Sequence, residues 1–293
     1  MVTASAANGT VSLVAGLTTN VVREAQRRHG LAPTASAAVG RMITGAALLG
    51  ASLGSRERLT LHVKGDGPIG SIVADSWIAN PRSVAARAYA HNPGADLPLN
   101  ERGKFDVAGV VGKGQLQVTK SYEVGQPYNG IVPLESGEIG EDIAAYLAHS
   151  QQIPSVVALG VLANPEGIVA AGGIIAQLMP GADDSTIATL ERNARAMAAV
   201  TQQIVDGADP EALLAAVSHP LELKIFDTYG LAFGCRCTRE KVESALLGLG
   251  RDELAKMADE QPHTEATCEF CKRRYVLSAS EVTELAARLD AHA

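Results

Sequence analysis

Several features are missing from this 293-residue sequence, and each absence excludes a class of protein. Basic residues do not outnumber acidic ones: the formal net charge is −7, so the chain lacks the basic excess that binding to nucleic-acid phosphates requires. The longest uncharged run, residues 143–165, contains a histidine, two glutamines and two prolines, which predicts that it does not span a membrane. No lysine or arginine precedes Arg23, so the positive start of a secretory signal is lacking, and we expect a cytoplasmic protein.

Cysteine is also scarce, and it is confined to one end of the chain. Residues 1–234 contain none, whereas Cys235, Cys237, Cys268 and Cys271 follow within a short window. Hydrophobic residues make up 46% and charged residues 19%, which is ordinary for a folded chain, and the length suggests two or three folding units. We therefore expect the cysteine-bearing window to be a domain of its own.

The first part of the chain mixes helix and strand signals. Apolar residues at helical spacing after Pro33 predict an amphipathic helix that packs on a sheet. Residues 59–64 alternate in polarity and are followed by a Gly-Asp-Gly turn and the apolar residues 69–73, which predicts a β-hairpin. Residues 107–111 and 116–119 predict a second hairpin. Because strands and helices do not alternate regularly, the fold class is predicted to be α+β.

The middle of the chain carries a narrow apolar stripe at helical spacing, formed by Ile187, Leu190, Ala194, Met197, Thr201 and Ile204. Asp209 and Pro210 predict the start of a second, shorter helix. Two interpretations remain open. The helices form a hairpin packed permanently on the core, or they form a detachable cover over an apolar surface. The scarcity of aromatic residues, 4% of the chain, predicts a modest contact of the kind that a reversible cover needs.

The four cysteines form two close pairs, Cys235-Arg-Cys237 and Cys268-Glu-Phe-Cys271. Two short-spaced pairs of thiolates separated by a folded insert are typical of a closed, tetrahedral zinc site. A secreted disulfide framework is excluded because the chain is long and has no other cysteine. Each pair is close enough in sequence to close a local disulfide, so an oxidant would consume all four ligands of the metal. A domain that depends on the metal would then unfold.

Six basic residues lie within a few positions of a cysteine, and they are predicted either to stabilise the negative charge of a four-thiolate site or to form a solvated surface. They are Arg236, Arg239, Lys241, Lys272, Arg273 and Arg274. His263, five residues before Cys268, is the one alternative ligand considered. Zinc ribbons usually have Cys-x-x-Cys in both halves, whereas the first half here is Cys-x-Cys, which is a tighter chelate. This difference between the two halves limits the zinc-binding families that the chain can resemble.

With both halves in view, the chain resembles the 33 kDa chaperonin family of redox-regulated heat-shock holdases, from about Leu17 to the carboxyl end. The motifs that carry the resemblance are Cys235-Arg-Cys237-Thr-Arg-Glu240, Cys268-Glu-Phe-Cys271 followed by Tyr275, Lys64-Gly-Asp-Gly-Pro68, Tyr128-Asn-Gly-Ile-Val132, and Ala170-Ala-Gly-Gly173 leading to Gln177 and Pro180. Two departures are a threonine at position 238, where serine is common, and Gln151 in place of a glutamate.

The resemblance implies an ATP-independent chaperone and no enzyme, with no catalytic residue. It implies a core chaperone domain over residues 1–180, a helical linker over 181–230 and a zinc-binding redox switch over 231–293. The four cysteines would hold one Zn²⁺ in the reduced form and pair as Cys235–Cys237 and Cys268–Cys271 on oxidation. Zinc would then be released, the switch and linker would unfold, and oxidised chains would dimerise. Unfolding client proteins would be held for ATP-dependent refolding chaperones.

Two other function classes compete with this interpretation. Cys268-x-x-Cys271 is also typical of thiol oxidoreductases, but those place the motif at a helix start, and the sequence after Tyr275 indicates a strand. The alternative function is a zinc-ribbon module that binds RNA or a protein partner through Lys272, Arg273 and Arg274, with Phe270 and Tyr275 as stacking groups. An acidic domain and only three adjacent charges argue against that alternative.

Overall fold

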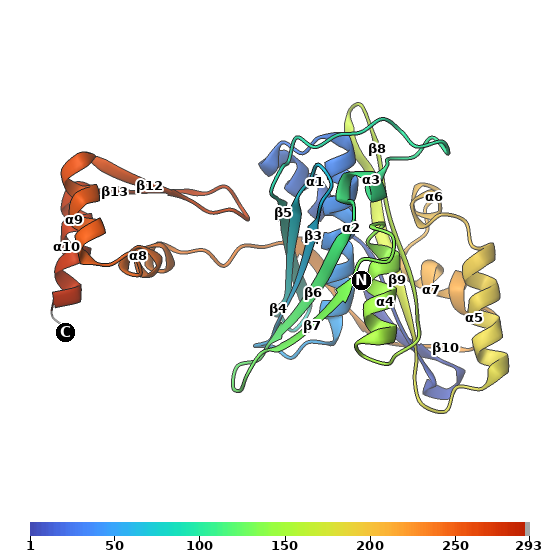
Figure 1. Ribbon diagram of the computed structural model, residues 1–293. Coiled ribbons are helices and arrows are strands. Elements are labelled where there is room, and N and C mark those ends of the chain that lie inside the picture. The colour runs from blue at the N-terminus through green and yellow to red at the C-terminus, as the bar shows by residue number, and fades with distance from the viewer. Residues whose placement is uncertain (291–293) are drawn as a thin grey trace. The chain divides into compact units, whose positions relative to one another are not determined.

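Figure 1 shows the computed structural model, which describes residues 1–290. The chain divides into two compact units, one formed by residues 1–234 and the other by the residues from Cys235 onward. No helix in the described part of the chain is both long enough and apolar enough to cross a membrane. The second unit begins four residues beyond the boundary expected at residue 231, while the separation of core from linker within the first unit remains a prediction.

The first unit is built on two large sheets. Its strands are β1 (Val2–Ala6), β2 (Val11–Leu17), β3 (Arg58–Gly65), β4 (Ser71–Asn80), β5 (Ser83–Ala90), β6 (Gly114–Ser121), β7 (Tyr128–Pro133), β8 (Ser155–Asn164), β9 (Gly167–Leu178), β10 (Leu223–Thr228) and β11 (Gly230–Phe233). The five-stranded sheet has the order β10-β1-β2-β9-β8, and the six-stranded sheet has the order β11-β5-β4-β3-β6-β7. Neighbouring strands are antiparallel except for β11, which is parallel to β5.

The helices of this unit are α1 (Thr19–His29), α2 (Pro33–Leu49), α3 (Val107–Val111), α4 (Gly140–His149), α5 (Asp184–Ala196), α6 (Val200–Val205) and α7 (Pro210–Ser218). Helix α2 contacts strands of both sheets, and the main apolar core surrounds it. It begins at Pro33, as the sequence predicts, but it is not amphipathic, because every residue from position 34 to 48 except Arg41 is buried. Small residues allow this enclosure: a Cβ at Gly45 would lie 2.4 Å from Ile143 Cδ1.

One predicted hairpin is confirmed and the other is wrong. Strands β3 and β4 pair as expected, with Lys64 opposite Ser71. Residues 107–111, however, form the short helix α3, whose start is capped by Asp106 accepting a hydrogen bond from the Gly109 amide at 2.8 Å. The valine-rich sequence has the composition of a strand, but the cap and the burial of valines at helical spacing favour a helix. Strand β6 pairs instead with β3 and β7.

Helices α5, α6 and α7 cover the outer face of the five-stranded sheet, where they close a second apolar core (Figure 1). The sheet contributes Val2, Ala4, Ala6, Val11, Leu13, Ala15, Ile174 and Ala176, and the helices contribute Leu190, Val200, Leu213, Leu214 and Val217. The predicted stripe is interrupted near Met197, where α5 ends. Asp209 caps α7 as predicted, accepting from the Ala212 amide at 2.8 Å. Both a permanently packed helical hairpin and a detachable cover would have this packed arrangement.

Glycines allow the covering helix α6 to approach the sheet closely. A Cβ at Gly160 would lie 2.7 Å from Thr201 Cγ2, and a Cβ at its cross-strand neighbour Gly172 would lie 2.7 Å from Ile204 Cδ1. The linker is not wholly helical, since it also supplies β10, which pairs with β1. The sequence did not indicate this strand pair because its two partners lie at opposite ends of the first unit.

Strand β11 ends at Phe233 and pairs with β5 in the six-stranded sheet. Gly234, which stands between β11 and Cys235, lies against Ala85 and Trp77: a Cβ there would be 2.8 Å from Ala85 Cβ and 3.0 Å from the Trp77 ring. Trp77 is the single tryptophan of the chain and is 8% exposed. Residues 231–233 therefore belong structurally to the first unit.

The second unit is small. It consists of α8 (Arg239–Leu247), α9 (Arg251–Glu260), the antiparallel strands β12 (His263–Thr267) and β13 (Arg274–Ser278), and α10 (Ala279–Asp290). Its apolar core is limited to Leu246, Leu254, Leu277, Val282, Leu285 and Ala286. A unit of this size with so small a core needs an additional link, such as a metal or a disulfide, to be stable.

We expect Gly67→Ala to destabilise the first unit by about 1–3 kcal/mol, because the turn between β3 and β4 packs against the end of α3. The new Cβ would lie 2.5 Å from the Val110 carbonyl oxygen and 2.7 Å from the Val111 carbonyl carbon, and backbone cannot move aside as a side chain does. Urea unfolding measures the change. Gly94→Ala is the control, since its nearest neighbour would be Asn92 Oδ1 at 3.6 Å; equal unfolding midpoints would contradict the prediction.

Candidate metal centre

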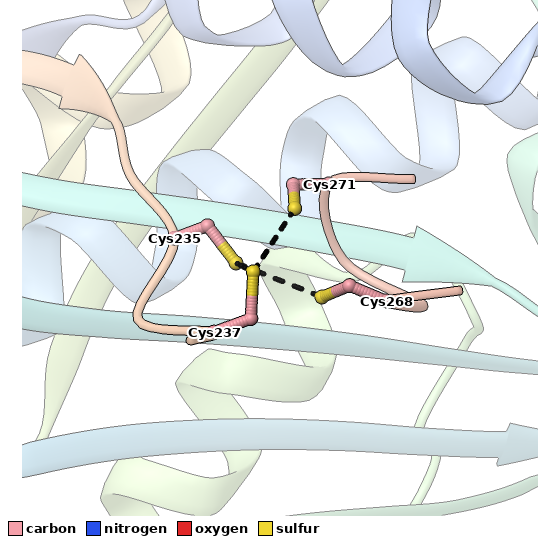
Figure 2. A group of neighbouring side chains, drawn as sticks. All are labelled: Cys235, Cys237, Cys268 and Cys271. Carbon is pink, nitrogen blue, oxygen red and sulfur yellow. Dashed lines mark hydrogen bonds between the residues drawn. The ribbon is translucent and has the colours of Figure 1, made fainter. Parts of the chain in front are cut away.

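The structure brings the four cysteine sulfurs together in the second unit. Figure 2 shows the side chains pointing toward one another from two separate loops. The Sγ atoms of Cys235 and Cys237 are 3.4 Å apart, those of Cys235 and Cys268 are 3.7 Å apart, and those of Cys237 and Cys271 are 3.4 Å apart. All four lie within 4.8 Å of one another.

The first pair lies in the loop that joins β11 to α8. Thr238 directly follows Cys237 and caps α8, its hydroxyl accepting from the Lys241 amide at 3.3 Å. The threonine that departs from the family pattern thus keeps a hydroxyl that caps the helix. By fixing the start of α8, the cap also fixes the direction in which the chain leaves Cys237.

The second pair lies in the tight turn between β12 and β13. The Cys268 amide donates to the Arg273 carbonyl at 2.9 Å, and the Lys272 amide donates to the Cys268 carbonyl at 2.8 Å. Lys272 closes the turn in the left-handed region at φ 58°. This folded turn holds both thiols on the same side of the loop, toward Cys235 and Cys237 (Figure 2).

The spacing of the sulfurs fits a tetrahedral metal. Zinc–sulfur bonds of about 2.3 Å give a tetrahedron whose sulfur–sulfur edges are about 3.8 Å long. The three measured separations, 3.4 to 3.7 Å, approach that value. They are far longer than the roughly 2.05 Å of a disulfide, and all four residues are free thiols. The four reduced sulfurs are therefore spaced so that they could hold one metal ion.

Burial favours the protonated thiol at two of the four cysteines, Cys268 and Cys271. Burial raises the pKa of Cys271 to about 12, and the sulfurs around it add to this increase. Burial also raises the pKa of Cys268, although the backbone N–H groups of Cys271 and Phe270 oppose the increase. A metal ion must displace these protons, so metal affinity is expected to fall as the pH falls.

Tyr275 is a neighbour of the site that the sequence placed in a family motif, and as a stacking group in the alternative function, without assigning it a role at the cysteines. Its hydroxyl donates to Cys237 Sγ at 3.2 Å, and this hydrogen bond raises the pKa of Tyr275. Arg273 completes the arrangement: its contact with Tyr275, together with the nearby sulfurs of Cys237 and Cys271, raises the pKa of the guanidinium. Such partners orient a metal ligand and stabilise its charge.

Most of the other basic residues predicted to surround the sulfurs are engaged elsewhere. Arg239 pairs with Glu243 and Glu281, Lys272 pairs with Glu269, and Arg274 pairs with Glu265. The Lys241 ammonium donates to the Arg236 carbonyl at 2.7 Å. The carboxylates cancel much of the positive charge expected from the sequence, and they compete with any phosphate for Lys272 and Arg274.

The remaining alternatives also lack support in the geometry. His263 is an exposed residue of β12 opposite Ser278, and the cluster of metal-ligand residues in the described chain consists of the four cysteines. The strand predicted after the Cys-x-x-Cys pair is β13, and a second strand, β12, precedes the pair. The pair is therefore not at the helix start that lowers a thiol pKa in oxidoreductases.

Comparisons with known proteins agree with this site. A family model described as "Hsp33 protein" matches residues 1–278, beginning ahead of the expected Leu17. The 33 kDa chaperonin of Bacillus licheniformis is 44% identical over 287 residues, covering 97% of this chain and 98% of the relative. That of Acetivibrio thermocellus is 42% identical, covering 97% and 96%.

A solved structure agrees as well. The crystal structure of the 33 kDa chaperonin, or heat shock protein 33 homologue, from Thermotoga maritima matches with a TM-score of 0.87 at 34% identity and covers 98% of each chain. Fold, sequence and the four-sulfur cluster lead to the same conclusion: this chain belongs to the Hsp33 family of 33 kDa chaperonins, which are holdases and not enzymes.

Proposed function

We propose that the chain is a redox-regulated holdase of the cytoplasm in which Cys235, Cys237, Cys268 and Cys271 together hold one Zn²⁺. The observation that carries the proposal is the tetrahedral spacing of four reduced sulfurs in a unit with a small apolar core. When bound, the ion would cross-link the two loops and keep all four sulfurs deprotonated. Structural zinc contributes roughly 10–16 kcal/mol, which is as large as the net stability of about 5–15 kcal/mol that a whole domain usually has.

The same sulfurs would act as the sensor. Cys235 would pair with Cys237, and Cys268 with Cys271. Each disulfide forms from two thiolates that lose two electrons, while one peroxide takes up those electrons and two protons to give two waters. Two peroxides would thus consume all four ligands, and the second unit would lose the link that keeps it folded. The bacterial cytoplasm keeps such thiols reduced under ordinary conditions.

The linker, residues 181–230, would transmit this change to the core. It is joined to Cys235 through β11, and its helices bury an apolar sheet face with five fully buried side chains. The rest of the predicted stripe, including Ile187 and Met197, is only half-buried. A helical cover with so few fully buried apolar side chains is suited to release, after which the exposed surface would bind unfolding clients. Oxidised chains would dimerise and pass clients to ATP-dependent refolding chaperones.

The central test compares the reduced and oxidised chain. We expect the reduced zinc form to leave a heat-unfolded client to aggregate. Peroxide with mild heating should release one Zn²⁺ per chain and start suppression of light scattering. Zinc release is followed with a colorimetric chelator. Equal suppression before and after oxidation would remove the redox switch from the proposal.

A second prediction concerns the ligands. Cys271→Ser should weaken zinc binding by more than about a hundredfold, because a buried thiolate is replaced by a hydroxyl that does not ionise at neutral pH. Amide spectra should then show residues 235–290 unfolded without any oxidant. Thr238→Ser keeps the α8 cap and is the matched control. A folded, zinc-loaded Cys271→Ser protein would exclude the proposed ligand set.

A third prediction concerns the linker. Leu214 is fully buried in the second core, so Leu214→Ala should weaken docking of the linker by about 2–5 kcal/mol. Faster hydrogen exchange in α5–α7 and partial holdase activity are expected in the reduced, zinc-bound form. Val205→Ala is the control, since Val205 is 49% exposed. Identical exchange in both variants would show that the linker is not held by this core.

A further inference from the structure

The two large sheets of the first unit end in four edge strands, and three of these carry the usual protection against pairing with another chain. Strand β10 contains Lys224 and Asp227, β7 ends in Pro133, and β11 has only four residues. Charge, proline and shortness each discourage an incoming strand.

Strand β8 is the exception. It spans ten residues, Ser155–Asn164, and contains no charged residue and no proline. It is hydrogen-bonded to β9 on one side and ends the sheet on the other. Its pairing with β9 is regular from Ser155 to Leu162, and the register shifts only after that residue. A long, regular and apolar edge of this kind is a template for an additional strand.

The open edge of β8 lies at the bottom of a groove. A hollow of about 610 Å³ is lined by residues 158–165, and a neighbouring hollow of about 330 Å³ is lined by residues 157–159. The two hollows share Arg41, Lys104, Phe105, Ala158 and Leu159, so they adjoin along the strand. The larger hollow is mainly apolar, whereas the smaller one is lined by charged side chains and by the start of α4. Consecutive residues of β8, whose side chains point to opposite faces of the sheet, line the larger hollow. This is expected if the hollow lies along the edge of the strand.

Two walls flank this floor. The loop that contains Leu99 and Phe105 forms one wall, and residues 197–201, which join α5 to α6 and begin α6, form the other. Leu99 is 58% exposed and Leu162 is 38% exposed, so apolar surface is accessible along the groove. The second wall belongs to the linker. Release of the linker would therefore widen access to the β8 edge while leaving the loop wall in place.

We propose that the edge of β8 is a client-docking site that captures an extended, apolar segment of an unfolding protein by adding it to the five-stranded sheet. This rests on the proposed holdase function and specifies its binding surface. The chemistry of the edge selects the occupant: unpaired main-chain donors and acceptors match an extended backbone, and the neutral strand and the mainly apolar larger hollow match apolar side chains. If the β8 edge of a folded second copy entered the groove, the loop with Leu99 and Phe105 of that copy would have to enter with it. An unfolded segment brings no such loop.

The first experiment probes the backbone requirement. The probe is a fluorescein-labelled peptide of alternating valine and threonine, as long as the regular part of β8, and its anisotropy is followed with the oxidised full chain. A second peptide has the same side chains but carries N-methyl groups along both edges. We expect it to bind about tenfold or more weakly, because it has lost the donors that pair with the sheet. Equal binding of the two peptides would overturn the proposal.

The second experiment tests the location. Leu162→Lys places a charge on the β8 edge, and Leu99→Lys places one on the loop wall outside the strand. A folding defect in β8 could weaken peptide capture by the first variant but not by the second. Each should weaken peptide capture by about tenfold. Ile131→Lys is the matched control, because Ile131 is a 57% exposed aliphatic residue on the edge strand β7 of the other sheet. Thermal unfolding confirms that the variants are folded.

Zinc release and light scattering separate failure of this inference from failure of the proposed function. If the oxidised wild-type chain releases zinc and suppresses aggregation, but Leu162→Lys and Leu99→Lys bind the peptide as the wild type does, the docking site is wrong and the holdase stands. If Leu162→Lys abolishes the oxidised dimer and leaves peptide capture unchanged, the edge belongs to a second copy, which also overturns the proposal. An oxidised wild-type chain that never suppresses aggregation would refute the proposed function itself.

Discussion

The convergence of four sulfurs from two loops is the interaction on which the second unit depends. The turn at Cys268 and Cys271 and the capped loop at Cys235 and Cys237 are each held by local hydrogen bonds. The apolar core of this unit contains six buried residues, which is little for a domain that must fold without assistance. A link at the sulfurs is therefore worth more here than it would be in a larger domain.

The first unit is organised in the opposite way. Helix α2 is enclosed by both sheets, and the core around it needs no external link. The linker lies between these extremes, since it buries five side chains fully and leaves most of its helical surface exposed. The buried apolar core thus becomes smaller from the part around α2, through the part under α5–α7, to the cysteine-bearing unit.

The sequence revealed most where local chemistry decides the structure. The spacing of the cysteines predicted their convergence, the Gly-Asp-Gly turn predicted the β3–β4 hairpin, and Asp209 predicted the start of α7. It failed where distant contacts decide. The valines of α3 have the composition of a strand, α2 is buried on all sides only because two sheets enclose it, and β10 pairs with a strand more than two hundred residues away.

The contact between Gly234 and Trp77 gives the molecule an optical marker of its own state. The single indole of the chain is shielded by the residue that immediately precedes the first cysteine, and no second tryptophan obscures its emission. Detachment of β11 would expose the indole to water and shift its fluorescence to longer wavelength. The release of the strand next to the sensor is thereby visible in unlabelled protein, in real time and in the same cuvette as the oxidant.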